Sequence, residues 1–143
     1  MQQRLTARLS NVIPFFPFSD DEAAVIAHKF VLRLCDSYRE PIATTSIDYL
    51  GKIHLNLHED GEACSILGKS YTIDEGAHSL EWAVEDKIGK AVSKAYWSFE
   101  EPVEEVKEGL LLEMVAAVRL NEERVAEVNI HVEREITSPR SFA

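Results

Sequence analysis

The spacing of the apolar residues changes along this chain, and that change restricts the fold more than any other feature. Between Ala23 and Leu34 they recur every three or four positions, the period of an amphipathic helix. Between Leu110 and Val118 every second residue, counted from Leu110, is apolar, as in a strand with one buried face. Helical patterns come first and a hairpin closes the chain. This order favours an α+β domain, with helices packed on a small three-stranded, mostly antiparallel sheet.

The start and the end of the first helix are marked clearly. Ser19 and Glu22 match the S-x-x-E capping box, and acidic residues follow Ser19, where they favour the positive end of a helix. Phe18 and Ala23 occupy the positions of a hydrophobic staple. Because proline disfavours helical geometry in the residue before it, we expect the helix to end before Pro41.

The middle of the chain predicts one strand and two helices. Residues 53–57 alternate between apolar and polar, so we expect a strand that pairs with the C-terminal hairpin. Asp60 is expected to cap a short helix, and Thr72 with Glu75 to form a second capping box before the longest helix. The inward positions of the longest helix are predicted to be Leu80, Val84, Ile88, Ala91, Ala95 and Phe99.

The end of the chain predicts a hairpin. Residues 110–118 form its first strand, Asn121-Glu122-Glu123 its turn, and residues 128–132 its return strand.

Length, charge and cysteine content narrow the functional classes. A chain of 143 residues is one ordinary domain, and its net charge of −10 makes nucleic acid a poor partner. The longest strongly apolar run, residues 11–18, is interrupted by two prolines and is too short to cross a membrane. Cys35 and Cys64 match no metal or disulfide spacing, which suggests reduced thiols in an intracellular, cytoplasmic protein.

One segment resembles a nucleotide-binding motif only in part. Gly68-Lys69-Ser70 resembles the end of a P-loop, but a P-loop has another glycine five residues earlier, where this chain has Ala63. A P-loop also follows a strand, whereas these residues end a predicted helix. We therefore interpret Gly68 as a glycine at a helix C-terminus.

Three further groups of residues have ordinary interpretations. His54 and His58 share a strand face but are too far apart to hold one metal ion, so we expect solvent-facing histidines. The acidic residues between 100 and 108 lack the glycine-centred loop of a calcium site and favour a solvated linker over a cation site or a partner surface. Trp82 and Trp97 are expected to be packing residues rather than a ligand cage.

Two segments resemble parts of Clp-type AAA+ ATPases. Residues 5–18 are similar to the stretch that runs through a strand and a Phe-x-Pro turn into the first helix of the small, or lid, domain. Residues 75–80, Glu-Gly-Ala-His-Ser-Leu, resemble the Leu-Gly-Ala-Arg-Pro-Leu segment that opens a long lid helix and carries the sensor-2 arginine. With the closing hairpin, residues 5–134 resemble the C-terminal small domain of a ClpB-like or torsin-like ATPase, closest to the fungal type.

The resemblance implies roles for five residues. Arg8 aligns with the arginine finger, which reaches a neighbouring subunit's nucleotide and offsets charge in the transition state. Ile26 would contact the adenine ring, although a plain core position is the alternative. Gly76, Ala77 and His78 align with the sensor-2 segment. The family has arginine where this chain has His78, which is shorter and has no bidentate fork, so a weakened or lost sensor-2 function is implied.

The same resemblance divides the chain into three parts. Residues 1–18 would link to an AAA+ large domain outside this chain, residues 19–134 would form the lid domain, and residues 135–143 a flexible C-terminal tail. No Walker A or Walker B motif occurs in the chain. We therefore expect no ATP hydrolysis and no cofactor for the chain alone, while ATP or ADP with Mg²⁺ would belong to the full-length ATPase.

The implied function is closure of a nucleotide pocket and contact between subunits in a chaperone or unfoldase ring. The implied partners are the AAA+ large domain, neighbouring subunits and an unfolded protein client. The alternative is a degenerate lid-fold module for protein–protein interaction without nucleotide coupling, suggested by His78 and the acidic composition. The isolated chain is expected to be a monomer, or a weak dimer that uses residues 12–18.

Overall fold

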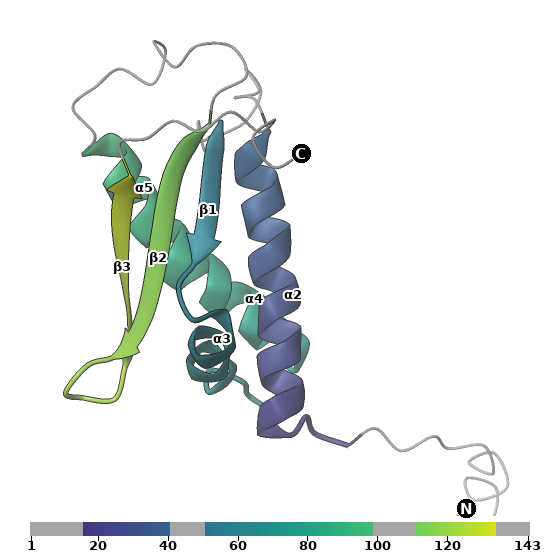
Figure 1. The fold of residues 1–143 in the computed structure, drawn as a ribbon. Coiled ribbons are helices and arrows are strands. Elements are labelled where there is room, and N and C mark those ends of the chain that lie inside the picture. The colour runs from purple at the N-terminus through teal and green to yellow at the C-terminus, as the bar shows by residue number, and fades with distance from the viewer. Residues whose placement is uncertain (1–15, 41–50, 99–110, 134–143) are drawn as a thin grey trace, which may run out of the picture.

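The computed structural model describes residues 16–40, 51–98 and 111–133. Its elements follow in the order α2 (Asp20–Arg39), β1 (Ile53–Leu57), α3 (Asp60–Gly68), α4 (Ala77–Val84), the π-helix η1 (Glu85–Gly89), α5 (Lys90–Trp97), β2 (Leu112–Leu120) and β3 (Ala126–Glu133). Figure 1 shows α4 and α5 crossing behind the three strands, with α2 alongside β1. The expected α+β class is confirmed. Arg8, the acidic stretch 100–108 and the expected tail 135–143 lie outside the described residues.

The start of α2 agrees with the sequence. The Ser19 hydroxyl accepts a hydrogen bond from the Glu22 N–H at 3.3 Å, and the Glu22 carboxylate accepts one from the Ser19 N–H at 2.8 Å. Two of the N–H groups at the start of α2 are thereby satisfied. The last helical residue is Arg39, two before Pro41.

The sheet is mixed. Its strand order is β1-β2-β3, with β1 parallel to β2 and β2 antiparallel to β3. Ile53 lies opposite Leu112, so the expected pairing of the strand at 53–57 with the hairpin is confirmed. The parallel pair was not expected; it arises because the helices between β1 and β2 return the chain to the end of the sheet where β1 begins.

The start of α3 differs from the prediction by one residue. The N-cap is Glu59, which has φ 47° and ψ 59° and makes no side-chain capping bond, while Asp60 is already helical. The Asp60 carboxylate accepts a hydrogen bond from the Gly61 N–H at 2.8 Å instead.

The last residue of α3 is Gly68, as the sequence suggests. Glycine is required here by close packing against α2. A Cβ at Gly68 would come within 3.0 Å of the Ala24 backbone nitrogen on α2. Glycine therefore lets two helices approach closely here, and the chain continues from a helix into turns rather than from a strand into a phosphate loop. The P-loop interpretation is thus not supported.

The predicted longest helix is one helical segment from Ala77 to Trp97 with a π turn in its middle. Its buried positions step by four residues: Leu80, Val84, Ile88, Val92 and Tyr96. An α-helix repeats every 3.6 residues, so repeated steps of four would turn the buried stripe away from the core. The wider π turn compensates for this drift.

The π turn changes which residues after Ile88 face the core. The spacing of an uninterrupted α-helix predicts Ala91 and Ala95, but both are only half-buried, and Val92 and Tyr96 are buried instead. The predicted inward position of Phe99 lies outside the described residues.

The hairpin follows the predicted alternation. Every second residue of β2 from Leu112 to Val118 is buried, and alternate residues of β3 pack against the same core. The Asn121 side-chain oxygen accepts hydrogen bonds from the N–H groups of Glu123 and Val125, at 3.0 and 2.9 Å. Arg124 completes the turn with φ 58°.

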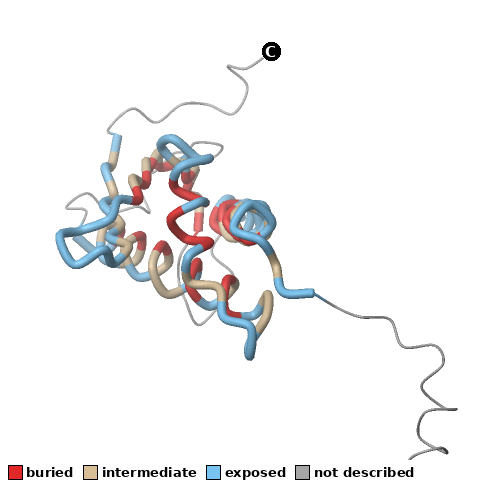
Figure 2. The backbone as a smooth tube through the Cα atoms, turned by 90° about the horizontal axis from the view of Figure 1, so that it is seen from below, coloured by how far each residue is buried: buried red, intermediate tan, exposed pale blue. Residues whose placement is uncertain are grey.

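The core lies between the sheet and the helices. Figure 2 shows buried residues on the sides of the helices and strands that face the centre, and exposed residues on their outer sides. The largest fully buried side chains are Ile53, Leu67, Leu80, Ile88, Leu112 and Met114, which come from both layers. Within the described residues, no helix is long and apolar enough to span a membrane.

Candidate functional site

The candidate site is the turn that opens α4, where the sequence places Gly76, Ala77 and His78. The Thr72 N–H donates to the Ser79 hydroxyl at 3.1 Å, and this hydroxyl donates to the Gly76 carbonyl at 2.6 Å. The Gly76 N–H donates back to the Thr72 carbonyl at 2.9 Å. Ser79 is the one residue of the buried polar or charged class among the described residues, and its two hydrogen bonds hold the turn on the side that faces the core.

This arrangement contradicts the predicted Thr72–Glu75 capping box. The N-cap of α4 is Gly76, and the Thr72 N–H, which a capping-box Glu75 would accept, is bonded to Ser79. Gly76 has φ 59° and ψ −139°, a conformation that residues with a Cβ avoid. A Cβ there would meet no atom within 4 Å, so backbone geometry rather than space requires glycine.

His78 belongs to the first turn of α4 and faces solvent, with 82% of its side chain exposed. Its Nδ1 lies 3.2 Å from the Oε2 of Glu81, and the other carboxylate oxygen of Glu81 accepts a hydrogen bond from Arg33 of α2 at 3.2 Å. The Arg33 guanidinium lies 5.5 Å from the ring centroid of Phe30. One carboxylate therefore joins His78 to α2.

A hollow of about 160 Å³ lies beside this carboxylate, between α2 and α4. Apolar, polar and charged side chains line it: Phe30, Arg33, Leu34, Ser37, Glu81, Val84 and Glu85. A hollow of this size accepts a single side chain rather than a nucleotide.

The structure brings the predicted site residues together only in part. Gly76, Ala77 and His78 form the start of α4, as the resemblance implies. Ile26 is half-buried on α2, against which α4 packs, but Ile26 does not line the α2–α4 hollow. Arg8 lies outside the described residues.

The start of α4 fits a phosphate poorly. The N–H groups of His78 and Ser79 already donate to the carbonyls of Glu75 and Gly76, at 3.3 and 3.2 Å. The Glu81 carboxylate also lies 3.2 Å from the His78 Nδ1, where its negative charge disfavours a second anion. With histidine at position 78, the N–H groups of His78 and Ser79 are therefore not free to bind a γ-phosphate.

His54 on β1 and His58, which directly follows β1, lie beside different carboxylates. His54 is half-buried rather than solvent-facing, and its Nδ1 lies 3.6 Å from a carboxylate oxygen of Glu113 on β2. His58 is exposed and lies 3.9 Å from Glu59. No group of three or more potential ligands that could hold a metal ion occurs in the described parts of the chain.

The two cysteines are buried free thiols. Burial raises the pKa of both, and that of Cys64 reaches about 11. Cys64 shares a hollow of about 230 Å³ with His28 and Asp60, which approach within 3.7 Å of each other. The neutral thiol makes this arrangement a poor nucleophile despite its Cys-His-Asp composition.

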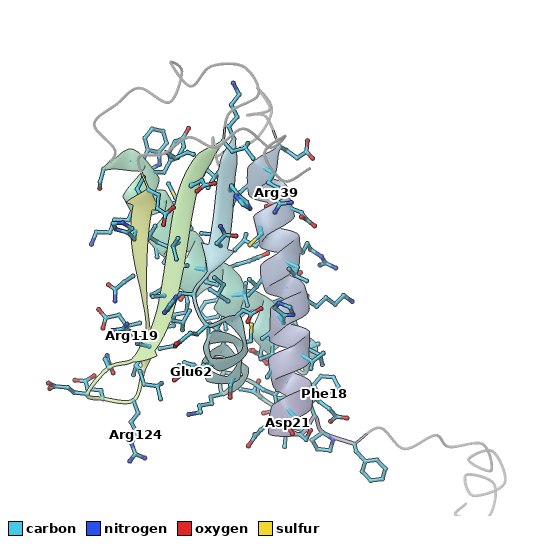
Figure 3. All side chains as sticks on the ribbon, viewed as in Figure 1. Phe18, Asp21, Arg39, Glu62, Arg119 and Arg124 are labelled. Carbon is cyan, nitrogen blue, oxygen red and sulfur yellow. The ribbon has the colours of Figure 1, made fainter. Side chains whose placement is uncertain are left out.

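A third hollow, of about 280 Å³, lies between α3 and β2. Glu62 and Arg119, both labelled in Figure 3, line it from these two elements, together with His58 and Glu59. Charges of both signs leave it without a clear ligand preference.

The tryptophans contradict the prediction that they pack in the core. Trp82 is 65% exposed on α4 and Trp97 is 68% exposed at the end of α5. The Trp97 ring meets Tyr96 edge-on at 5.5 Å. Both therefore leave aromatic surface open to contact.

Sequence reasoning missed the residues that hold the site in place. Arg33 and Glu81 are 48 positions apart, and charged residues on solvent-facing helical positions carry no signal of their partner. Ser79 could have been suspected, because it is a polar residue directly before the inward position Leu80.

No protein-family model matches this chain, and a search of curated proteins finds no match. The resemblance to the Clp-type lid domain gains no support from these comparisons.

Proposed function

We propose that this chain is the C-terminal lid domain of a Clp/ClpB-like AAA+ ATPase, which helps to close the nucleotide pocket and to join subunits of a chaperone or unfoldase ring. One observation supports the proposal: the segment Gly76-Ala77-His78 opens α4, with Gly76 as the N-cap. The similar segment of the Clp-type ATPases also opens a long lid helix. Under this proposal the protein acts in the cytoplasm, on an unfolded protein client.

The proposed role is structural rather than catalytic. The hydrogen bonds around Ser79 hold the start of α4, and the Arg33–Glu81 pair ties it to α2. Ile26 would make an apolar contact with the adenine ring of a nucleotide that is bound by the large domain. No contact from His78 to the γ-phosphate is part of the proposal, because the His78 ring already lies beside the Glu81 carboxylate.

The test is a titration of the full-length protein with ATP and ADP. Ile26→Ala should lower the affinity for both ATP and ADP by about tenfold, since it removes the apolar contact to the adenine ring that the two nucleotides share. The matched control is Val25→Ala, an exposed neighbour whose loss should change neither affinity. The proposal fails if Ile26→Ala leaves both affinities unchanged, or if no Walker A and Walker B motifs precede these residues in the full-length protein.

A second pair of variants examines residue 78. His78→Arg should raise the affinity for ATP about tenfold more than the affinity for ADP, because it supplies the positive charge that the family has at this position. His58→Arg adds the same charge at an exposed site elsewhere and should have no such preference. His78→Ala should leave both affinities nearly unchanged; a large loss would show that His78 is a working sensor.

One observation favours the alternative, a lid-fold interaction module without nucleotide coupling. His78 pairs with Glu81, and exposed Trp82 lies one turn further along α4. Such a surface suits contact with another protein. The alternative predicts that neither Ile26→Ala nor His78→Arg changes any nucleotide affinity.

A further inference from the structure

The two edges of the sheet differ in how they are covered. The β1 edge faces α2, which packs against β1 and runs alongside it in Figure 1. β3 forms the other edge over eight residues, from Ala126 to Glu133, and no further strand pairs with it in the described part of the chain.

The register shows which backbone groups of β3 point outward. Asn121 and Val125 are hydrogen-bonded partners at the end of the ladder, so the odd-numbered residues of β3 bond to β2. The even-numbered residues Val128, Ile130 and Val132 therefore direct their N–H and C=O groups away from the sheet. None of these groups is hydrogen-bonded to another described residue. An open strand edge of this kind is a template for another strand.

The side chains of β3 make this edge complementary to itself. Its outer face carries exposed Glu127, Asn129, His131 and Glu133. If a second copy pairs antiparallel about Asn129, the backbone groups of Val128 meet those of Ile130 from the second copy. Glu127 then lies opposite His131 of the second copy, twice by symmetry. These are non-hydrogen-bonded positions, where facing side chains approach most closely.

The neighbouring register is less favourable. Pairing about Ile130 would place Glu127 opposite Glu133 of the second copy, and like charges directly opposite each other destabilise a strand pair. Of these two registers the one centred on Asn129 is favoured, because it places no like charges opposite each other on β3 and sets the Glu127 carboxylate opposite an imidazole.

We propose that the β3 edge is an interface between two copies of this chain, which pair antiparallel about Asn129. α5 packs against β3 and ends at exposed Trp97, and in Figure 1 this end of α5 lies at the same corner as the end of β3. One added strand buries less than the roughly 800 Å² per partner of a standard interface, so the dimer is weak. It uses a different surface from residues 12–18 and does not depend on the proposed function.

The test is sedimentation of the purified chain over a wide concentration range at 0.15 M salt. At this salt concentration the Debye length is about 8 Å, so the repulsion between two acidic copies is weakened. His131→Glu places two carboxylates opposite each other and should weaken the dimer about tenfold. Glu127→Lys should also weaken it. The double variant places opposite charges across the interface and should return dimerisation to within about threefold of the unaltered chain.

The matched control is Glu133→Lys, which changes net charge as Glu127→Lys does but faces no charge in this register. Its dimerisation should stay within about threefold of the unaltered chain. A strong gain from Glu133→Lys would instead support the register centred on Ile130. Glu127→Lys also sets a lysine opposite Arg119 within the same sheet, and the double variant leaves that repulsion in place. Rescue by the double variant therefore reports on contact between copies.

The unaltered chain supplies a second readout. Its amide NMR signals at Val128, Ile130 and Val132 should shift with protein concentration, whereas those of Glu127 and Asn129, bonded within the sheet, should shift little. The proposal is overturned if the chain stays monomeric at every concentration, or if the double variant dimerises no better than the single ones. A monomer whose outward amides exchange rapidly would leave the β3 edge open to a strand of another protein.

Discussion

The capping-box pattern occurs twice in this chain and leads to two different structures. At Ser19-Asp20-Asp21-Glu22 both reciprocal hydrogen bonds form, and α2 begins at once. At Thr72-Ile73-Asp74-Glu75 the segment forms a turn, and α4 begins only after Gly76. The same four-residue pattern is thus compatible with a helix start and with a turn that precedes one.

The difference lies in the residues that follow each pattern. After Glu22 come alanines and a valine, and no other acceptor reaches the Ser19 N–H within the described residues. After Glu75 comes Gly76, which can adopt positive φ, and then Ser79, whose buried hydroxyl accepts the Thr72 N–H. A buried acceptor held by the core replaces the exposed carboxylate of Glu75.

The largest effect should come from removing that acceptor. Ser79→Ala leaves the Thr72 N–H without its acceptor and removes the hydroxyl hydrogen bond to the Gly76 carbonyl, which keeps only the bond from the residue 79 N–H, so we expect a loss of about 2 kcal/mol in the free energy of unfolding. The control is Ser98→Ala, an exposed serine bonded to the Lys94 carbonyl, which should change stability by less than about 0.5 kcal/mol. Equal effects in urea unfolding would show that Ser79 does not lock the turn.

A smaller difference in the free energy of unfolding should distinguish the two hydroxyl residues that begin the patterns, Ser19 and Thr72. Ser19→Ala removes a true N-cap and should destabilise the protein by about 1 kcal/mol. Thr72→Ala removes an exposed side chain that caps nothing and should cost less than about 0.5 kcal/mol. If both substitutions cost about 1 kcal/mol in the same unfolding assay, Thr72 caps a helix after all.

The smallest effect should come from the two glutamates. Glu22→Ala removes the carboxylate that accepts the Ser19 N–H and should cost about 0.5 kcal/mol, less at high salt. Glu75→Ala should leave the free energy of unfolding unchanged within error, because no helix begins at residue 72. A salt-dependent loss for Glu75→Ala would contradict the assigned start of α4.

Much of the fold follows from local sequence patterns. The alternation in β2 and the three-to-four spacing in α2 determine which faces are buried, because burial of apolar surface dominates the packing energy. The parallel pairing of β1 with β2 was not predictable, because strand direction depends on the path of the helices between them. The phase shift at the π turn, which buries Val92 in place of Ala91, also depends on packing against the sheet.

The candidate site was predicted only in outline. The family resemblance placed Gly76, Ala77 and His78 at a helix start, where the structure has them, whereas the capping pattern placed that start at Thr72. Neither placed the Glu81 carboxylate beside His78, because that contact depends on how the first turn of α4 lies against α2. The exposure of Trp82 and Trp97 was also missed, although neither belongs to the predicted inward positions of this helix, so the spacing was a better guide here than the aromatic character of the side chains.

Substitution of Gly76 tests the start of α4 most directly, because alanine of either hand can be placed there by semisynthesis. Positive φ at Gly76 predicts that L-alanine destabilises the protein by about 2 kcal/mol. D-alanine, which prefers this conformation, should stabilise it by about 0.5–1 kcal/mol. A helix that ran through residue 76 would reverse both signs. That reversal would place His78 in the helix interior and remove the observation on which the lid proposal rests.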